Sequence, residues 1–206
     1  MKIRLFIIIT VWFSISLTVV GSMGICTESK GQIFREGTIR KGYLRKGDPI
    51  YHGDRLQVAN NSFLSLNMIF EKVMISLYDN TIIKIFQNED ETTLYNEIAL
   101  FGGKVIVQME EGYDTKFVLN APSAIATAFD AHFLVEYKDD IFFDNPSYSI
   151  ITLLKGKMEI KNTVSGDYIY LKEGQTMVST IDGKFLQLDT FRNKSIIPNT
   201  INNYRF

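Results

Sequence analysis

The sequence predicts an all-β protein of stacked short antiparallel strands, arranged as a β-solenoid-like roll or a sandwich. Apolar and polar residues alternate in several stretches between residues 32 and 188, and this period of two places apolar side chains on one face of a strand. Turn-forming pairs such as Asn60-Asn61 and Asp182-Gly183 interrupt the stretches roughly every eight to twelve residues. No stretch keeps a helical spacing of apolar residues for three turns.

The expected strands follow one another along the chain and are rich in Ile, Val, Phe and Tyr, which pack well on a half-buried pleated surface. Each has its apolar residues at alternate positions, so each is expected to present one face to a core. The core residues predicted in this way are Leu64, Leu66, Met68 and Phe70, then Val73, Ile75 and Leu77, then Val105, Val107 and Met109, and finally Phe117 with Leu119 and Met158 with Ile160.

A weak internal repeat favours the solenoid-like arrangement. Residues 100–107 resemble residues 153–160, since both have an apolar pair, a Gly-Lys step and alternating apolar residues. Residues 44–48 likewise resemble residues 171–175. Recurring strand–turn units are typical of stacked β-repeats, and the alternative is a chance similarity between β-hairpins.

Residues 1–24 are predicted to be a signal peptide that directs export. Lys2 and Arg4 precede an uncharged stretch over residues 5–20, and small residues follow it up to Gly24, which is the three-part pattern of such peptides. Extended to residue 26, the apolar run is long enough to span a bilayer, so an uncleaved membrane anchor is the alternative.

Cys26 lies where a bacterial lipoprotein carries its acylated cysteine, but Ile25 replaces the small residue that normally precedes such a site. We therefore expect an unmodified, exposed thiol near the mature N-terminus, with lipidation as the alternative. Residues 25–189 are expected to form the β domain. Residues 190–206 are polar and Asn-rich and are expected to form a loosely docked tail.

The composition disfavours an enzyme. The 206 residues carry 22 Lys+Arg against 23 Asp+Glu, so there is no basic excess for binding nucleic acid. The single Cys excludes a disulfide framework and a multi-cysteine zinc site, and the two His, His52 and His132, are far apart in sequence. We expect no catalytic, cofactor-binding or metal-ligating residues, and no cofactor.

The turns and strands resemble the periplasmic FecR domain family, over roughly residues 31–188. The similarity consists of a Gly-Asp turn followed by a second Gly and a Ser, a strand that begins with Gly, a Pro-containing element and two closing Gly turns. These landmarks indicate a fold and no chemistry, and they are Gly47, Asp48, Gly53, Ser62, Gly103, Pro122, Phe133, Gly156 and Gly174.

One element departs from the family pattern. The family usually has Gly-Thr-x-Phe-x-Val after its Pro strand, whereas this chain keeps Phe133 and Val135 but has Asp130 and Ala131 in place of Gly-Thr. The family's Gly is expected to permit a tight turn, and Asp tolerates unusual φ better than most residues.

The resemblance implies a binding protein. The best-known members of the family are inner-membrane proteins whose cytoplasmic segment restrains a sigma factor, and here only residues 1–4 precede the apolar stretch. We expect a stand-alone version of the domain in the periplasm or cell envelope of a bacterium, where it docks another envelope protein. Open sheet edges are the expected docking surface, by addition of a strand, and membrane contact is expected only through the N-terminal segment.

Two other functions stay open. A carrier of lipid or glycan would use an aromatic-lined groove between β-layers. Tyr168 and Tyr170 alternate on one strand, and if exposed they would stack on sugars or fill a partner's pocket; core packing is the alternative for these rings. An envelope hydrolase using His132 and the acids within 139–144 is the third hypothesis, and it lacks a recognisable triad or metal set. The basic residues within 35–46 are expected on the solvent face of a strand, with contact to an anion or a lipid headgroup as the alternative.

Overall fold

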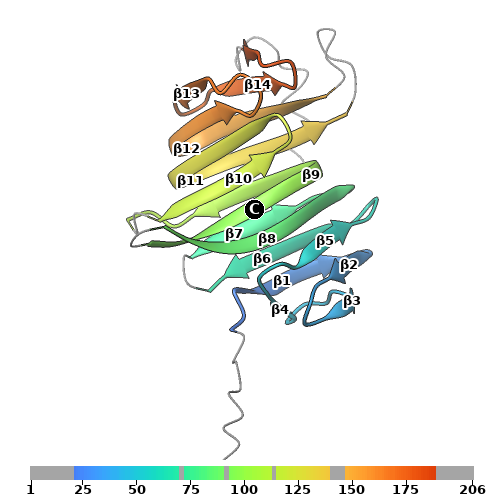
Figure 1. Ribbon diagram of the computed structural model, residues 1–206. Helices are drawn as coiled ribbons and strands as arrows, with labels where there is room; N and C mark the ends of the chain where they lie inside the picture. The colour runs from blue at the N-terminus through green and yellow to red at the C-terminus, as the bar shows by residue number, and fades with distance from the viewer. Residues whose placement is uncertain (1–20, 70–71, 91–92, 113–114, 140–146, 189–206) are drawn as a thin grey trace, which may run out of the picture.

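Fifteen strands joined by hydrogen bonds into one open sheet make up the described part of the chain (Figure 1). The computed structural model describes residues 21–69, 72–90, 93–112, 115–139 and 147–188. Within these ranges there is no helix, and thus none that is long and apolar enough to cross a membrane. The prediction of an all-β protein is confirmed.

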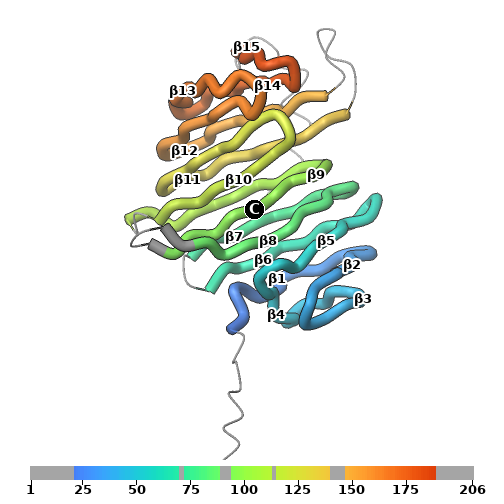
Figure 2. Tube along the Cα trace, in the orientation of Figure 1, coloured from blue at the N-terminus to red at the C-terminus, as the bar shows by residue number. Residues whose placement is uncertain are grey.

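The sheet folds into two layers that share three long, bent strands: β9 (Thr93–Met109), β11 (Ala124–Lys138) and β12 (Tyr148–Asn162). One layer, called the β6 layer, also contains β4 (Pro49–Ile50), β1 (Gly24–Lys30), β6 (Phe63–Met68), β7 (Val73–Leu77), β14 (Thr176–Thr180) and β15 (Phe185–Leu188). The other, called the β8 layer, also contains β3 (Lys41–Tyr43), β2 (Ile33–Glu36), β5 (Arg55–Val58), β8 (Thr81–Asp90), β10 (Lys116–Ala121) and β13 (Tyr168–Leu171). Figure 2 shows the chain running from β1–β4 at one end of the stack to β13–β15 at the other.

The long strands bend where the backbone adopts positive φ. The first part of β9 pairs with β8 and β10, whereas the part after Gly103 pairs with β7 and β11. Gly103 has φ +84°, and a Cβ there would lie 2.5 Å from the Cα of Thr81, so no larger residue fits. β12 bends at Gly156 (φ +92°) and β11 bends at Asp130 (φ +45°). Asp130, a residue type expected to tolerate unusual φ, thus adopts a positive φ at this bend.

The core lies between the layers and receives side chains from both. Phe117 of the β8 layer and Phe133 of the β6 layer meet there, with ring centroids 6.1 Å apart, and both side chains are fully buried. The alternating residues predicted from the sequence lie in this core, with the exception of Phe70, which is outside the described residues. Side chains thus fill the space between the layers where an aromatic-lined groove was considered.

Two details of the predicted architecture are wrong. Strands β9, β11 and β12 have 15 to 17 residues and are not short, because the Gly102-Gly103 pair bends β9 without ending it. The pair β9–β10 is parallel, with Phe117 opposite Asn96, whereas all strands were expected to be antiparallel. The alternation of apolar residues identifies strands but carries no information on the direction of their partners.

The internal repeat corresponds to two matching corner turns, one at each end of the stack. In residues 45–48, Asp48 accepts a hydrogen bond from the backbone N–H of Arg45 (2.8 Å) and donates its own N–H to the carbonyl of Arg45 (3.0 Å). In residues 172–175, Gln175 makes the same two contacts with Lys172, at 2.8 and 3.0 Å. These two similar segments therefore adopt the same turn.

The sheet begins closer to the N-terminus than expected. Gly24 is the first residue of β1, and the N–H of Met23 donates to the carbonyl of Ile50 (2.8 Å). Cys26 is 1% exposed and pairs with Leu66 of β6, so the prediction of an exposed thiol is wrong. Burial, together with nearby Asp48, raises the pKa of the Cys26 thiol to about 11. The signal segment before residue 21 and the tail over 190–206 lie outside the described residues.

Candidate functional site

The outer surface of the β8 layer carries all the exposed aromatic side chains of the described residues. Some stand in pairs with edge-on rings: the centroids of Phe34 and Tyr43 are 6.1 Å apart, and those of Tyr168 and Tyr170 are 6.0 Å apart. For the last two, exposure and core packing were the two alternatives, and they are 62% and 69% exposed on the outer face. The complete set is Phe34, Tyr43, Phe101, Phe129, Tyr168 and Tyr170.

Cationic side chains lie over aromatic rings on the same surface. The two partners come from the same strand, from adjacent strands or, for Arg55 and Phe101, from β5 and β9 on either side of β8, because strand alternation directs both partners outward. Such contacts hold the cation near the ring and leave the ring partly accessible. The pairs, with the distance from cation to ring centroid, are Arg55 over Phe101 (5.2 Å), Lys84 over Phe86 (5.1 Å) and Lys116 over Tyr95 (4.2 Å).

The acidic residues of this surface have neighbouring polar partners. Glu36 pairs with Lys41 at 2.9 Å near one edge. Near the middle, the Glu97 carboxylate accepts hydrogen bonds from the amide of Asn120 (2.6 Å) and from the amide of Asn88. These contacts hold the carboxylates against the sheet, between the cations.

Strand β13 forms an open edge of the β8 layer, because its one partner among the described strands is β12. The backbone N–H of Asn162 in β12 donates to the carbonyl of Asp167 (2.8 Å) just before β13. Since hydrogen-bonded and non-hydrogen-bonded pairs alternate in antiparallel strands, the N–H groups of Tyr168 and Tyr170 point away from β12. The edge therefore offers backbone donors next to two exposed rings.

The outer surface of the β6 layer differs from that of the β8 layer, because its aromatic and apolar side chains are packed together and buried. Tyr78, Ile106 and Leu134 form an apolar cluster there, with Phe63 packed against it, and the three are 5–7% exposed. Lys104 lies over the Tyr78 ring at 5.6 Å. Where β6 and β9 end and β7 begins, an open groove of about 650 Å³ is lined in part by methionines, and two other lining residues, Lys72 and Glu110, form an ion pair. The groove methionines are Met68, Met74 and Met109.

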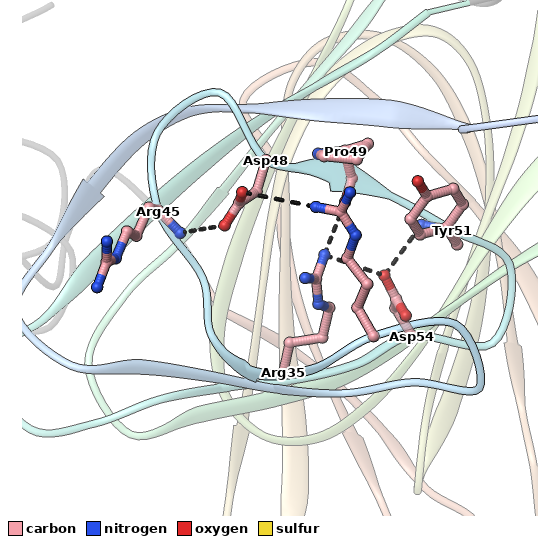
Figure 3. A network of polar contacts seen from close by, with 7 residues as sticks. Arg35, Arg45, Asp48, Pro49, Tyr51 and Asp54 are labelled. Atoms are coloured by element: carbon pink, nitrogen blue, oxygen red, sulfur yellow. Dashed lines mark hydrogen bonds and ion pairs between the residues drawn. The ribbon is translucent and has the colours of Figure 1, made fainter.

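Figure 3 shows a polar network inside the first end of the stack, below the corner turn of residues 45–48. Arg35 points inward from β2 and donates to the carbonyl of Pro49 (2.8 Å), and its nearest contact with the Asp54 carboxylate is 4.0 Å. The same carboxylate oxygen accepts the N–H of Tyr51 (2.9 Å). Arg35 and Asp54 are 4% and 0% exposed, so the prediction that Arg35 lies on a solvent face is wrong.

The buried charge of Asp54 is incompletely compensated. Burial raises the pKa of the Asp54 carboxyl above its ordinary value, against the opposing effects of the Tyr51 N–H and of Arg35. Its second oxygen and the Nε of Arg35 have no hydrogen-bond partner among the described residues. Because both groups are sealed from solvent, no substrate reaches them, and the network joins β2 to the turn after β4.

The opposite end of the stack contains a neutral network instead. The Asn162 amide donates to the Ser179 hydroxyl (2.8 Å) and to the carbonyl of Thr180 (3.0 Å), and Ser179 donates to the carbonyl of Ser123 (2.6 Å). The hydroxyls of Ser123 and Ser149 are 2.7 Å apart. All five residues are buried, and their hydrogen bonds join the two layers.

Comparison with known proteins supports the fold and no more. No protein-family model matches the sequence, and no curated protein matches it. Two crystal structures of a candidate anti-sigma factor from Parabacteroides distasonis have a similar fold, with TM-scores of 0.51 and sequence identities of 11% and 12%. Each match covers 65% of this chain and 58% of that chain, so the shared part is less than two thirds of the neighbour's length. The FecR resemblance stays a prediction.

Among the described residues, those considered for catalysis are not brought together. His132 in β11 and Asp139 just after it are seven positions apart along an extended strand, or about 23 Å. Asp139 accepts a hydrogen bond from the Ser147 hydroxyl (2.5 Å), and burial lowers the pKa of His132. His52 accepts the N–H of Gln87 at 3.1 Å. The remaining acids, Asp140 and Asp144, lie outside the described residues, within which no cluster of three metal-ligating side chains occurs.

The landmark residues of the FecR resemblance lie at turns and bends or in the core of the fold. The glycines lie at turns or bends with φ between +76° and +92°. The Ser62 hydroxyl accepts the N–H of Gln32 (2.9 Å) at the corner between β1 and β2, and Pro122 lies in the turn between β10 and β11. The aromatic and cationic surface was missed because side chains from distant strands meet on it only once the sheet is assembled.

Proposed function

We propose that this chain is a non-enzymatic, exported binding module of the FecR type, which docks another protein in a bacterial cell envelope. The observation that supports the proposal best is the open edge of β13, where outward N–H groups lie beside the exposed rings of Tyr168 and Tyr170. An incoming strand gains backbone hydrogen bonds at such an edge and contacts for alternate side chains. Aromatic residues are also among the side chains that contribute most to protein interfaces.

The structural neighbour is compatible with this class of function. It is named as a candidate anti-sigma factor. At the observed identity the likeness concerns the fold alone.

The test is crosslinking in cells of a tagged full-length chain, followed by purification and mass spectrometry. The Tyr170→Pro variant removes an N–H that points to the open edge and leaves the pairing of β13 with β12 in place. Tyr170→Thr is the matched control, because it removes the ring and keeps the N–H. We expect one envelope protein to be enriched with the wild type and with Tyr170→Thr, and to be lost with Tyr170→Pro.

Equal enrichment with Tyr170→Pro contradicts docking at this edge. Loss with both variants contradicts strand addition and assigns the contact to the ring. Enrichment of lipid or glycan without a protein contradicts the proposed function itself. Circular dichroism of both variants checks that the strand content is unchanged.

A further inference from the structure

The outer face of the β8 layer combines three properties that no other described surface has together. It is long, because nine strands from β3 to β13 lie side by side, which is about 38 Å at about 4.8 Å per strand. It carries the exposed aromatic rings, and cations lie over three rings of this face, of which Phe101 is exposed and Phe86 and Tyr95 are half-buried. A long open face of this kind suits a polymer better than a small molecule, which would need a concave pocket.

The charge on this face differs in sign from that of the whole chain. Among the strand residues whose side chains are described, six cations stand against three acids, although the chain as a whole has a net charge of −1. The acids are Glu36, Glu97 and Glu159, and the first two are held by Lys41 and by asparagine amides. The cations are Lys41, Arg55, Lys84, Lys116, Lys157 and Lys161.

We propose that this face binds an anionic polysaccharide, with aromatic rings against the apolar faces of sugar rings and lysines paired with carboxylate or phosphate groups. The centre of the site consists of Phe101 with Arg55, Phe86 with Lys84 and Tyr95 with Lys116. A protein partner fits the centre less well, because protein interfaces are depleted of lysine in their buried core, and here a cation lies over each of these rings. The proposal does not rest on the docking of a protein at β13.

The test is isothermal titration calorimetry of the full-length chain in detergent at low ionic strength. The probe is polygalacturonate, and fully methyl-esterified polygalacturonate is the matched neutral polymer. We expect the acidic polymer to bind at least about tenfold more tightly than its ester, and we expect added salt to weaken it, because salt screens exposed charges.

Variants locate the site. Lys84→Gln with Lys116→Gln, and separately Phe101→Ala, are expected to weaken polygalacturonate binding by about tenfold or more. Lys104→Gln is the matched control, because Lys104 also lies over an aromatic ring, that of Tyr78, but on the outer face of the β6 layer. We expect it to leave the affinity unchanged, and thermal unfolding checks that every variant is folded.

Four results overturn the proposal. The first is equal binding of the acidic polymer and its ester, and the second is that Lys104→Gln weakens binding as much as the β8-layer variants do. The third is that poly-glutamate of equal charge binds as tightly as polygalacturonate, which would show binding by charge without recognition of sugar. The fourth is that oligo-dT binds more tightly than either polymer, which would assign the rings to stacking on nucleic-acid bases.

Discussion

The two ends of the strand stack have the same corner turn but differ in the buried polar groups next to it. Residues 45–48 and 172–175 make matching backbone and side-chain hydrogen bonds. Next to the first turn, Leu44 donates its N–H to the carbonyl of Ile33, and next to the second, Leu171 pairs with Met158. Arg35 lies two positions after Ile33 and Ile160 lies two positions after Met158, so these two residues occupy equivalent places relative to their turns. One end thus has a buried guanidinium near a carboxylate, where the other has an apolar side chain and a neutral network.

The difference shows that the geometry of a corner does not dictate the chemistry behind it. A buried ion pair costs desolvation on both groups and needs good geometry to compensate, whereas neutral hydroxyl and amide groups cost less to bury when they are hydrogen-bonded. The contact between Arg35 and Asp54 is long, at 4.0 Å. We therefore expect the charged end to respond more strongly to mutation and to pH than the neutral end does.

The largest effect is expected from Arg35→Ile, which gives the first end the residue found at the second. It leaves the buried carboxylate of Asp54 without its nearest cation and is expected to lower the free energy of unfolding by about 3–5 kcal/mol. Urea unfolding followed by circular dichroism measures it. Arg35→Ile combined with Asp54→Leu is expected to recover most of the loss, and a single variant within about 1 kcal/mol of the wild type contradicts the role of the pair.

At the neutral end, Asn162→Ala is expected to cost less, about 1–3 kcal/mol. The amide donates to Ser179 and Thr180, and its oxygen accepts the N–H groups of Val164 and Ser165 at 2.8 and 3.0 Å. Its removal leaves buried polar groups without partners. The same unfolding measurement compares the two ends directly, and a cost above that of Arg35→Ile reverses the expected order.

A smaller loss in the free energy of unfolding is expected at the corner turns, and the loss is expected to be the same for both turns. Asp48→Ala and Gln175→Ala each remove one side-chain hydrogen bond to a backbone N–H, and each is expected to cost about 1 kcal/mol. Unequal costs, differing by more than about 1 kcal/mol, show that the turns are not energetically equivalent. Asp48→Asn, which keeps an acceptor, is the control for the first turn.

The smallest effect is expected in the pH dependence of stability. Burial raises the pKa of Asp54 in the folded protein, so above the ordinary pKa of about 3.9 the folded state holds this proton more tightly than the unfolded state does. The contribution of Asp54 to stability therefore falls as the pH rises through that window. Urea midpoints between about pH 4 and 7 are expected to change less in Asp54→Asn than in the wild type, and identical slopes contradict this.

Much of the fold follows from the sequence, because alternation is a local property. The inward positions of Leu66, Ile75 and Val107 were correct, and the similarity of residues 44–48 to 171–175 marked two equivalent turns. The parallel pairing of β10 with β9 depends on contacts between distant segments, which alternation does not encode. The burial of Cys26 was missed because the apolar run of the N-terminal segment continues into β1 without a break.

The candidate site was harder to predict than the fold. Tyr168 and Tyr170 are two residues apart, so their shared face was visible in the sequence. Phe101 and Arg55 come from strands 46 positions apart in the chain and meet only in the assembled layer. A surface whose side chains come from many strands has no sequence motif. Its positive charge is not visible in the composition either, because the net charge of the whole chain is near zero.

The three bent strands have a mechanical consequence. β9, β11 and β12 each pass from one layer to the other without interruption. If a ligand pulls on the β8 layer while the β6 layer is held, the tension runs along three covalent backbones as well as through the side chains packed between the layers. Separating the layers then requires strands to be stripped from their neighbours along their length, so the domain is expected to transmit a load as one stiff body.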